Sequence, residues 1–292
     1  MSDLRTINKI VTGMHTQDGA GVKLVRVIGR NDTADFDPFL MLDAFDSRNP
    51  EDYIKGFPWH PHRGIETITY LLQGDIEHGD SLGNKGSILD VEYQWMTAGS
   101  GIIHQEMPQA SERMLGVQLW LNLPAKDKMV MPKYHGITQA DIPVIDEGSS
   151  KIHIIGGIYQ GTKGAVEGDY IKPMLLDVEV KPDAEWTVET NRSDTLFIYI
   201  IQGAGTFDPA EETYIPEKHA VLFNEGSCLQ VKASDKGMRF LLMAAKPLHE
   251  PVAWGGPIVM NTKEELDHAF QELKENTFIK HCMHILMHLE HW

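Results

Sequence analysis

Short runs of apolar residues recur along this 292-residue chain, and turn-forming residues separate many of them. The runs are rich in β-branched, aromatic and aliphatic side chains, a composition that favours strands, and glycine, proline, asparagine or aspartate bounds many of them. They cover residues 67–73, 116–123, 174–181, 195–202 and 238–245. Many short strands punctuated by turns predict an all-β protein built as a sandwich or a barrel.

One segment near the end of the chain has helical character instead. Thr262 and Glu265 form a capping box, in which the threonine is the N-cap and the glutamate stands at the third helical position. Leu266, Phe270 and Leu273 then recur at helical spacing. The pattern predicts a helix that starts after Thr262 and ends near residue 275.

A five-residue pattern occurs twice, once on each side of a segment that mixes prolines with charged residues. The pattern reads YLLQG at residues 70–74 and YIIQG at residues 199–203, and the segment between them, residues 124–148, is the candidate domain boundary. The repetition suggests two copies of one β-unit. A match of this length also arises by chance, so the repeat alone does not establish the two copies.

Two pairs of polar side chains have a spacing that suits a metal site. In HPHRGIET, residues 60–67, His60 and His62 lie one residue apart, and in GSGIIHQEMP His104 and Glu106 repeat this spacing. In an extended segment, side chains at positions i and i+2 leave the backbone on the same side. On neighbouring strands of a barrel the four side chains could therefore meet around one ion. The alternative is a set of polar loop residues satisfied by backbone groups.

Three imidazoles and one carboxylate form a ligand set that suits Fe(II), and also Mn, Co, Ni, Cu or Zn. Four protein ligands leave about two positions of an octahedral ion open, as a catalytic site requires. The repeat offers an internal comparison, because its second copy carries different residues at the matching positions. Those residues are Glu189, Asn191, Leu229 and Val231. Repeated strands with ligands in one copy are expected of a two-barrel protein with a single working site.

Longer strings resemble one family, the pirins, which are bicupin proteins of the cupin superfamily. The strings are DPFLMLDAF, GFPWHPHRGIET, QWMTAGSGIIHQEMP and LWLNLP, and the resemblance runs from about residue 5 to residue 278. It implies two antiparallel cupin barrels, of the jelly-roll or double-stranded β-helix type, that face each other. Together with the boundary, it predicts an N-terminal barrel over residues 1–140 and a C-terminal barrel over residues 141–292, with few short helices and a C-terminal helical tail.

The resemblance also implies that one divalent metal ion, most often iron as Fe(II), lies in the N-terminal barrel. Its ligands fall on His60, His62, His104 and Glu106, and the C-terminal barrel carries none. Glu66 is a ligand in ordinary cupins, but in pirin-like chains Glu106 takes that role. We therefore expect Glu66 to orient a ligand histidine through a hydrogen bond, with direct coordination as the alternative.

Several residues near the predicted ligands have more than one interpretation. Arg63 either complements an anionic substrate or pairs with a nearby acid, and pairing is the expectation. Four bulky side chains either line a pocket for an aromatic molecule or belong to the core, and the core is the expectation. They are Phe57, Trp59, Trp95 and Met107.

Four histidines in the C-terminal tail are spaced three and four residues apart, so on a helix they would form one stripe. They are His281, His284, His288 and His291. The stripe either binds metal or contacts another subunit, or it is a solvated face of an amphipathic helix, and the solvated face is the expectation.

The formal net charge of −16 argues against direct binding to nucleic acid or to an anionic membrane surface, since both require a basic surface. The two cysteines, Cys228 and Cys282, are far apart in the sequence, which favours a reducing compartment. No apolar run has the length of a membrane span, and the first residues lack the apolar core of a signal peptide. These features predict a cytoplasmic protein.

The pirin resemblance implies a dioxygenase that opens the central ring of a flavonol such as quercetin with O2, releasing carbon monoxide and a depside. Glu106 would then also act as the general base that takes the hydroxyl proton of the substrate. The alternative is an iron-based redox sensor that regulates a protein partner through protein–protein contacts. Both interpretations require one bound ion per chain.

Overall fold

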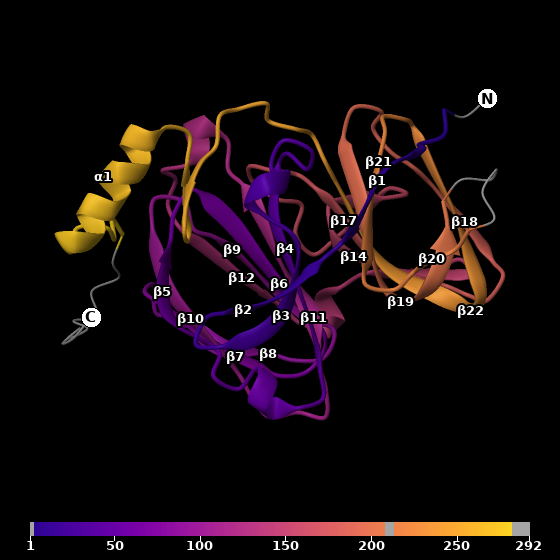
Figure 1. Cartoon of the computed structure of the whole chain (residues 1–292), viewed down its shortest axis with the longest axis horizontal. Helices are drawn as coiled ribbons and strands as arrows, with labels where there is room; N and C mark the ends of the chain where they lie inside the picture. The colour runs from indigo at the N-terminus through magenta and orange to yellow at the C-terminus, as the bar shows by residue number, and fades with distance from the viewer. Residues whose placement is uncertain (1–2, 208–212, 282–292) are drawn as a thin grey trace. The chain divides into compact units, whose positions relative to one another are not determined.

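The computed structural model describes residues 3–207 and 213–281, and within these ranges the chain is mostly β-strand (Figure 1). Each of the five apolar runs overlaps a strand. These strands are β6 (Ile65–Gln73), β11 (Met114–Asn122), β17 (Met174–Val180), β19 (Thr195–Thr206) and β22 (Cys228–Ala245). The all-β prediction is therefore confirmed.

The predicted helix is α1 (Lys263–Lys274), and it is the α-helix found within the described ranges. Its N-cap is Thr262, whose hydroxyl accepts a hydrogen bond from the backbone N–H of Glu265, and the reciprocal bond of the capping box is also present. The other helical segments are single 3-10 turns. They are η1 (Arg30–Asp32), η2 (Pro50–Asp52), η3 (Ala125–Asp127) and η4 (Gln139–Asp141). No helix among the described residues is long and apolar enough to cross a membrane.

The chain folds into two compact units that are each assembled from separate segments. Unit 1 comprises Met1–His15, Val25–Asp43 and Ile137–His249, and unit 2 comprises Thr16–Leu24, Ala44–Gly136 and Glu250–Trp292. The predicted domains, residues 1–140 and 141–292, follow chain order instead, and that division stays a prediction.

Unit 1 has an apolar core formed by buried side chains from the strands of a large sheet. The sheet order is β1-β21-β19-β22-β17-β14-β13, with β18 paired to β22 and β20 paired to β19. The remaining bounds are β1 (Ile7–Thr12), β13 (Val144–Asp146), β14 (Ser150–Gly156), β15 (Ile158–Tyr159), β16 (Thr162–Lys163), β18 (Glu185–Glu189), β20 (Ile215–Pro216) and β21 (His219–Phe223). Leu229 and Val231 are fully buried in this core. The repeat matched these two residues to His104 and Glu106, so apolar packing replaces the polar side chains here.

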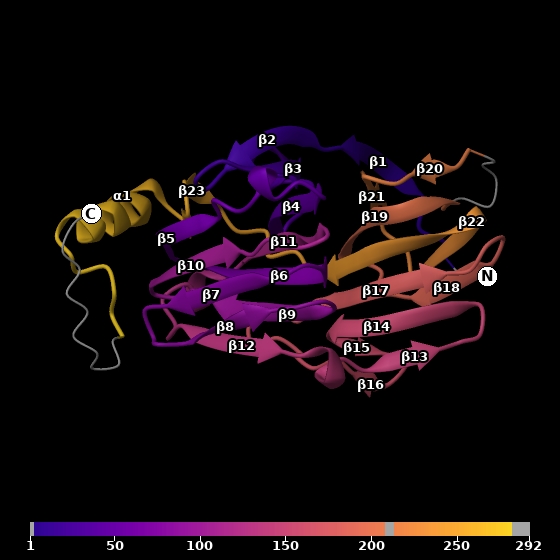
Figure 2. The same cartoon turned by 90° about the horizontal axis from the view of Figure 1, so that it is seen from below.

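Unit 2 holds the strands that carry the predicted ligands. A four-stranded sheet has the order β5-β10-β7-β8, and most of a seven-stranded sheet, in the order β12-β9-β6-β11-β4-β3-β2, also belongs to this unit (Figure 2). The bounds are β2 (Met14–Asp18), β3 (Val22–Ile28), β4 (Phe39–Ser47), β5 (Phe57–His62), β7 (Ile76–Asp80), β8 (Lys85–Ile88), β9 (Glu92–Thr97), β10 (Ile102–Pro108) and β12 (Lys133–Ile137). Side chains along β10 are alternately buried and half-buried, which places His104 and Glu106 on the same buried face.

The C-terminal part of unit 2 is a short hairpin followed by α1. The hairpin strands are β23 (Ala253–Gly255) and β24 (Ile258–Met260). Ile258 and Met260 share a small apolar core with Ala269 of α1 and with Phe278 beyond the helix. This core holds the hairpin, α1 and the last described residues together.

Candidate metal centre

The antiparallel pairing of β5 with β10 brings the histidines together. His104 lies directly opposite His60, and Ile102 lies opposite His62. The turn that leads into β10 contains Gly99 and Gly101, whose φ angles of 50° and 136° are ones that side-chain-bearing residues rarely adopt. A tight glycine turn therefore leads into β10.

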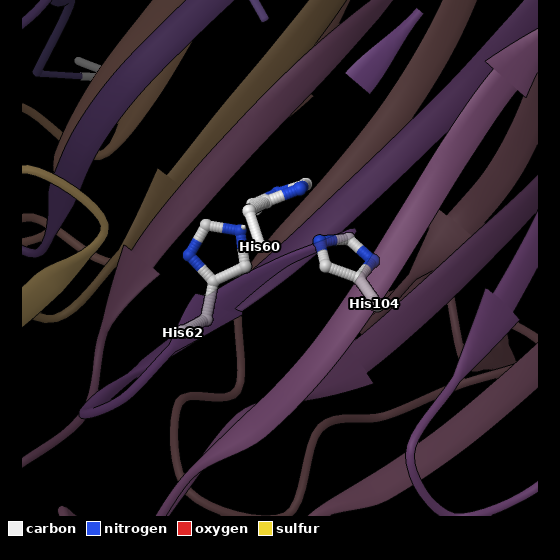
Figure 3. A group of neighbouring side chains, drawn as sticks. All are labelled: His60, His62 and His104. Atoms are coloured by element: carbon white, nitrogen blue, oxygen red, sulfur yellow. Dashed lines mark hydrogen bonds between the residues drawn. The ribbon is translucent and has the colours of Figure 1, made fainter. Parts of the chain in front are cut away.

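The three imidazoles converge on one point (Figure 3). One ring nitrogen from each of His60, His62 and His104 lies within 4.8 Å of the others. The ring centroids are separated by 4.4 Å for His60 and His104, by 4.8 Å for His60 and His62, and by 5.0 Å for His62 and His104. His62 and His104 are each 2% exposed, so the cluster is largely shielded from solvent.

Backbone carbonyls fix the tautomers of two rings. His60 Nδ1 lies 2.8 Å from the carbonyl oxygen of Pro58, and His62 Nδ1 lies 3.0 Å from that of Pro257. A carbonyl can only accept, so each Nδ1 carries a hydrogen, and in the neutral ring each Nε2 presents a lone pair. These two Nε2 atoms are 3.1 Å apart. Two lone pairs at this distance repel each other unless a proton or a metal ion lies between them, so with both rings neutral the arrangement fits a bound metal ion.

The third histidine agrees with this interpretation. His104 Nε2 is buried and has no hydrogen-bond partner among the described residues. Burial lowers the pKa of His62 and of His104 well below the usual range, and the neighbouring imidazoles lower both further. Both rings are therefore neutral near pH 7, which is the form that binds a metal.

Glu106 is buried on the same face of β10, but its carboxylate does not belong to the histidine cluster. Oε1 accepts hydrogen bonds from Thr69 Oγ1 at 2.7 Å and Gln94 Nε2 at 2.6 Å, and Oε2 accepts one from Gln118 Nε2 at 2.6 Å. Burial raises the pKa of Glu106, while these bonds and the nearby His60 oppose the rise. Coordination by Glu106 stays a prediction.

Sequence comparisons identify the family. The family model described as "Pirin" matches residues 21–121, and the model described as "Pirin C-terminal cupin domain" matches residues 175–279. The chain belongs to the pirin family. It is 40% identical to a Pseudomonas aeruginosa protein named "Putative quercetin 2,3-dioxygenase", over 94% of this chain and 98% of that protein.

Two solved structures have the same fold. A quercetin 2,3-dioxygenase from Acinetobacter baumannii matches with a TM-score of 0.85 and 30% identity, over 94% of this chain and 98% of that one. The bacterial pirin YhhW from Escherichia coli, crystallised in complex with nickel(II), matches with a TM-score of 0.64 and 19% identity, over 82% and 98% of the two chains. The fold is therefore that of a bicupin, as the sequence predicted.

The side chains of Glu66 and Arg63 have partners outside the histidine cluster. Glu66 is 1% exposed, and its Oε1 accepts a hydrogen bond from Thr97 Oγ1 at 2.7 Å. Its carboxylate is not part of the cluster. The Arg63 guanidinium forms an ion pair of 2.7 Å with Glu272, so the expected pairing with an acid is confirmed.

The predictions for the four bulky side chains near the ligands and for the tail histidines differ in how far the structure tests them. Phe57 packs against an apolar core cluster and Trp95 is fully buried, whereas Trp59 and Met107 are half-buried. The histidine stripe lies mostly outside the described residues, which include His281 but none of the other three histidines.

The sequence did not point to the residues that surround the predicted ligands. Three of them hold the Glu106 carboxylate, and a fourth, Trp120, packs edge-on against the His62 ring with 4.9 Å between centroids. Thr69, Gln94 and Gln118 are polar residues within apolar strands, and each is at most 7% exposed. Buried polar positions in a strand are the available signal, because such groups require a partner.

Proposed function

We propose that this protein is a metal-dependent dioxygenase of the pirin type that opens the central ring of flavonols such as quercetin. The observation that carries the proposal is the convergence of three imidazoles, with the Nε2 atoms of His60 and His62 held 3.1 Å apart beside a buried Nε2 of His104. The names of the Pseudomonas and Acinetobacter relatives support the reaction class. The substrates would be a flavonol and O2, and the products carbon monoxide and a depside.

His60, His62 and His104 would hold the ion, which we propose is Fe(II). Mn, Co, Ni, Cu and Zn suit the same ligands, and nickel is the ion named for the Escherichia coli pirin. When bound, the ion would supply Lewis acidity and electron transfer between substrate and O2.

Glu106 would be the fourth ligand and the general base. A carboxylate offers about four acceptor positions, and Thr69, Gln94 and Gln118 occupy three of them. The position that is left lies on Oε2, which could coordinate the ion or take the proton from the substrate hydroxyl. The raised pKa of Glu106 makes it a better proton acceptor than an exposed glutamate.

The direct test is a turnover assay on the protein loaded with Fe(II) under anaerobic conditions. Quercetin and air are added, and loss of the flavonol absorbance and release of CO are followed. We expect turnover by the wild-type protein and at least a 100-fold loss in His62→Ala and in Glu106→Ala. His219→Ala is a matched control, because His219 Nδ1, like that of His62, lies 3.0 Å from a backbone carbonyl oxygen, but His219 belongs to unit 1.

The assay also separates the two functional interpretations. One equivalent of bound metal without consumption of any flavonol would favour the redox sensor that acts on a protein partner. Turnover that persists unchanged in His62→Ala would contradict the proposed site itself. The protein partner and the cytoplasmic location both stay predictions.

A further inference from the structure

Arg63 directly follows the ligand His62 and lies between the two segments that carry the histidines. It is 1% exposed. Its Nε donates a hydrogen bond of 2.7 Å to the carbonyl oxygen of Ser100. Ser100 belongs to the glycine turn that leads into β10 and His104. One guanidinium nitrogen therefore joins the end of β5 to the start of β10.

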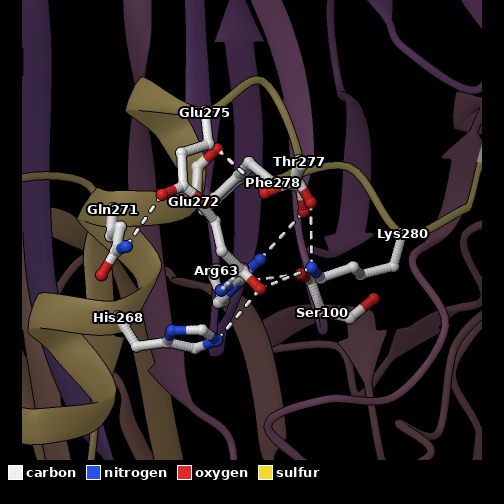
Figure 4. A network of polar contacts seen from close by, with 9 residues as sticks. All are labelled: Arg63, Ser100, His268, Gln271, Glu272, Glu275, Thr277, Phe278 and Lys280. Atoms are coloured by element: carbon white, nitrogen blue, oxygen red, sulfur yellow. Dashed lines mark hydrogen bonds and ion pairs between the residues drawn. The ribbon is translucent and has the colours of Figure 1, made fainter.

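The other guanidinium nitrogens contact the C-terminal segment, residues 263–280 (Figure 4). One pairs with Glu272 of α1 at 2.7 Å, and the other donates to the carbonyl oxygen of Phe278 at 2.9 Å. The guanidinium carbon also lies 4.1 Å from the centroid of the Phe278 ring. Buried arginines that donate in three directions have a fixed geometry, since the guanidinium is planar and its donors point in set directions.

Three further contacts join the segments that carry the histidines to residues after position 250. The carbonyl oxygen of Pro257, in the β23–β24 hairpin, accepts from the Nδ1 of His62, and Val259 N donates to the carbonyl oxygen of Arg63 at 3.1 Å. A Cβ on Gly101 would lie 3.0 Å from the Phe278 ring and from its carbonyl oxygen, so the glycine turn is in close contact with the C-terminal segment. Both ligand strands thus depend on residues beyond position 250 for their positions.

We propose that Arg63 is a positioning residue of the metal centre, and that metal binding and docking of the C-terminal segment are thermodynamically coupled through it. The proposal rests on the proposed function, because it assumes an ion at the three histidines. Partners that orient ligand side chains typically contribute 10- to 100-fold to metal affinity. Coupling is reciprocal, so bound metal must strengthen docking of the segment by the same factor.

The test compares Arg63→Met and Glu272→Gln with Lys280→Met. Lys280 Nζ contacts the same Glu272 carboxylate at 2.5 Å and the carbonyl oxygen of Thr277 at 2.9 Å, and not Arg63, so it is the matched control. Affinity for Co(II) is measured by equilibrium dialysis on the full chain. We expect the dissociation constant to rise about 10- to 100-fold in the first two variants and to stay within about 3-fold of wild type in Lys280→Met.

Hydrogen exchange of α1 supplies a readout that a merely structural contact would not change. Co(II) should slow exchange of the α1 amides in the wild-type protein by about the same factor as the affinity change, and this effect should vanish in Arg63→Met. If Arg63→Met does not fold, Glu272→Gln carries the test alone, because it keeps the shape of the side chain.

The outcomes distinguish this proposal from the proposed function. Wild-type Co(II) affinity in Glu272→Gln, with exchange of α1 that does not respond to metal, overturns the coupling. Failure of the wild-type protein to bind Co(II) overturns the metal centre instead. In that case, faster exchange at the Ser100 turn in metal-free Glu272→Gln would still support the positioning role of Arg63, and unchanged exchange there would overturn it.

Discussion

Replacement of Glu106 by glutamine tests two proposed roles of this residue separately: metal coordination, and acceptance of hydrogen bonds from the buried Thr69, Gln94 and Gln118. An amide has one oxygen, which can keep the hydrogen bonds from Thr69 and Gln94. Its NH2 group then faces the NH2 group of Gln118, where Oε2 now accepts a bond of 2.6 Å. Loss of that charge-assisted bond costs about 1.5–3 kcal/mol, and removal of a buried charge offsets part of the cost. We expect the metal-free variant to lose about 1–2 kcal/mol of unfolding free energy.

The effect on metal binding should be larger. Loss of the anionic ligand should weaken Co(II) binding at least about 100-fold, or about 2.7 kcal/mol. Urea unfolding of the metal-free protein gives the first quantity, and a Co(II) titration gives the second.

The double variant Glu106→Gln with Gln118→Glu is the matched control. It restores one carboxylate and one amide in exchanged positions, so stability should recover while metal affinity does not. A Glu106→Gln protein that binds Co(II) within 3-fold of wild type would refute coordination by Glu106. The site would then consist of the three histidines alone.

Other predictions concern stability. Burial lowers the pKa of His62 and His104, so below pH 6.5 the unfolded chain binds protons that the folded chain does not. In urea unfolding of the metal-free protein, the free energy of unfolding should fall by up to about 1.4 kcal/mol per pH unit for each histidine as the pH drops from 6.5. A His104→Asn variant with an equally steep decline would contradict this. Lys128→Met should lower the unfolding free energy by about 2–4 kcal/mol in the same assay, since the buried Nζ donates to three oxygens that would each lose this hydrogen bond; a loss below 1 kcal/mol would count against it. Asp177→Asn disrupts an ion pair with Arg239 in unit 1 that has two hydrogen bonds, and it should lower the free energy of unfolding by about 3 kcal/mol. Its Co(II) affinity should stay unchanged. A change in affinity would show that the metal centre is not confined to unit 2.

The features that the sequence predicted depend on local patterns. Strand composition, the capping box at Thr262 and the i, i+2 spacing of His60 and His62 are each set within a few residues. The convergence of His104 with this pair required only that two ligand segments lie on adjacent strands, which is how β5 and β10 pair.

The features that the sequence did not predict depend on register between distant strands. Thr69, Gln94 and Gln118 come from β6, β9 and β11, and they surround Glu106 because of how those strands align. A shift of one residue would turn each side chain to the opposite face of its sheet. No local pattern specifies that alignment, so the environment of Glu106 could not be read from the sequence.

The contact of Arg63 with Glu272 has the same origin. The sequence suggested that Arg63 pairs with an acid, but 42 acidic residues offered no basis for choosing one. The choice depends on how the segment after residue 250 returns to unit 2, which is also why the compact units do not follow chain order.

The central claim is that three histidine Nε2 atoms bind one cation, and a crystal of the Co(II)-loaded protein tests it most directly. Anomalous difference density should show one peak per chain at about 2.1 Å from the Nε2 atoms of His60, His62 and His104. Density elsewhere, or no density after loading at saturating Co(II), would contradict the account.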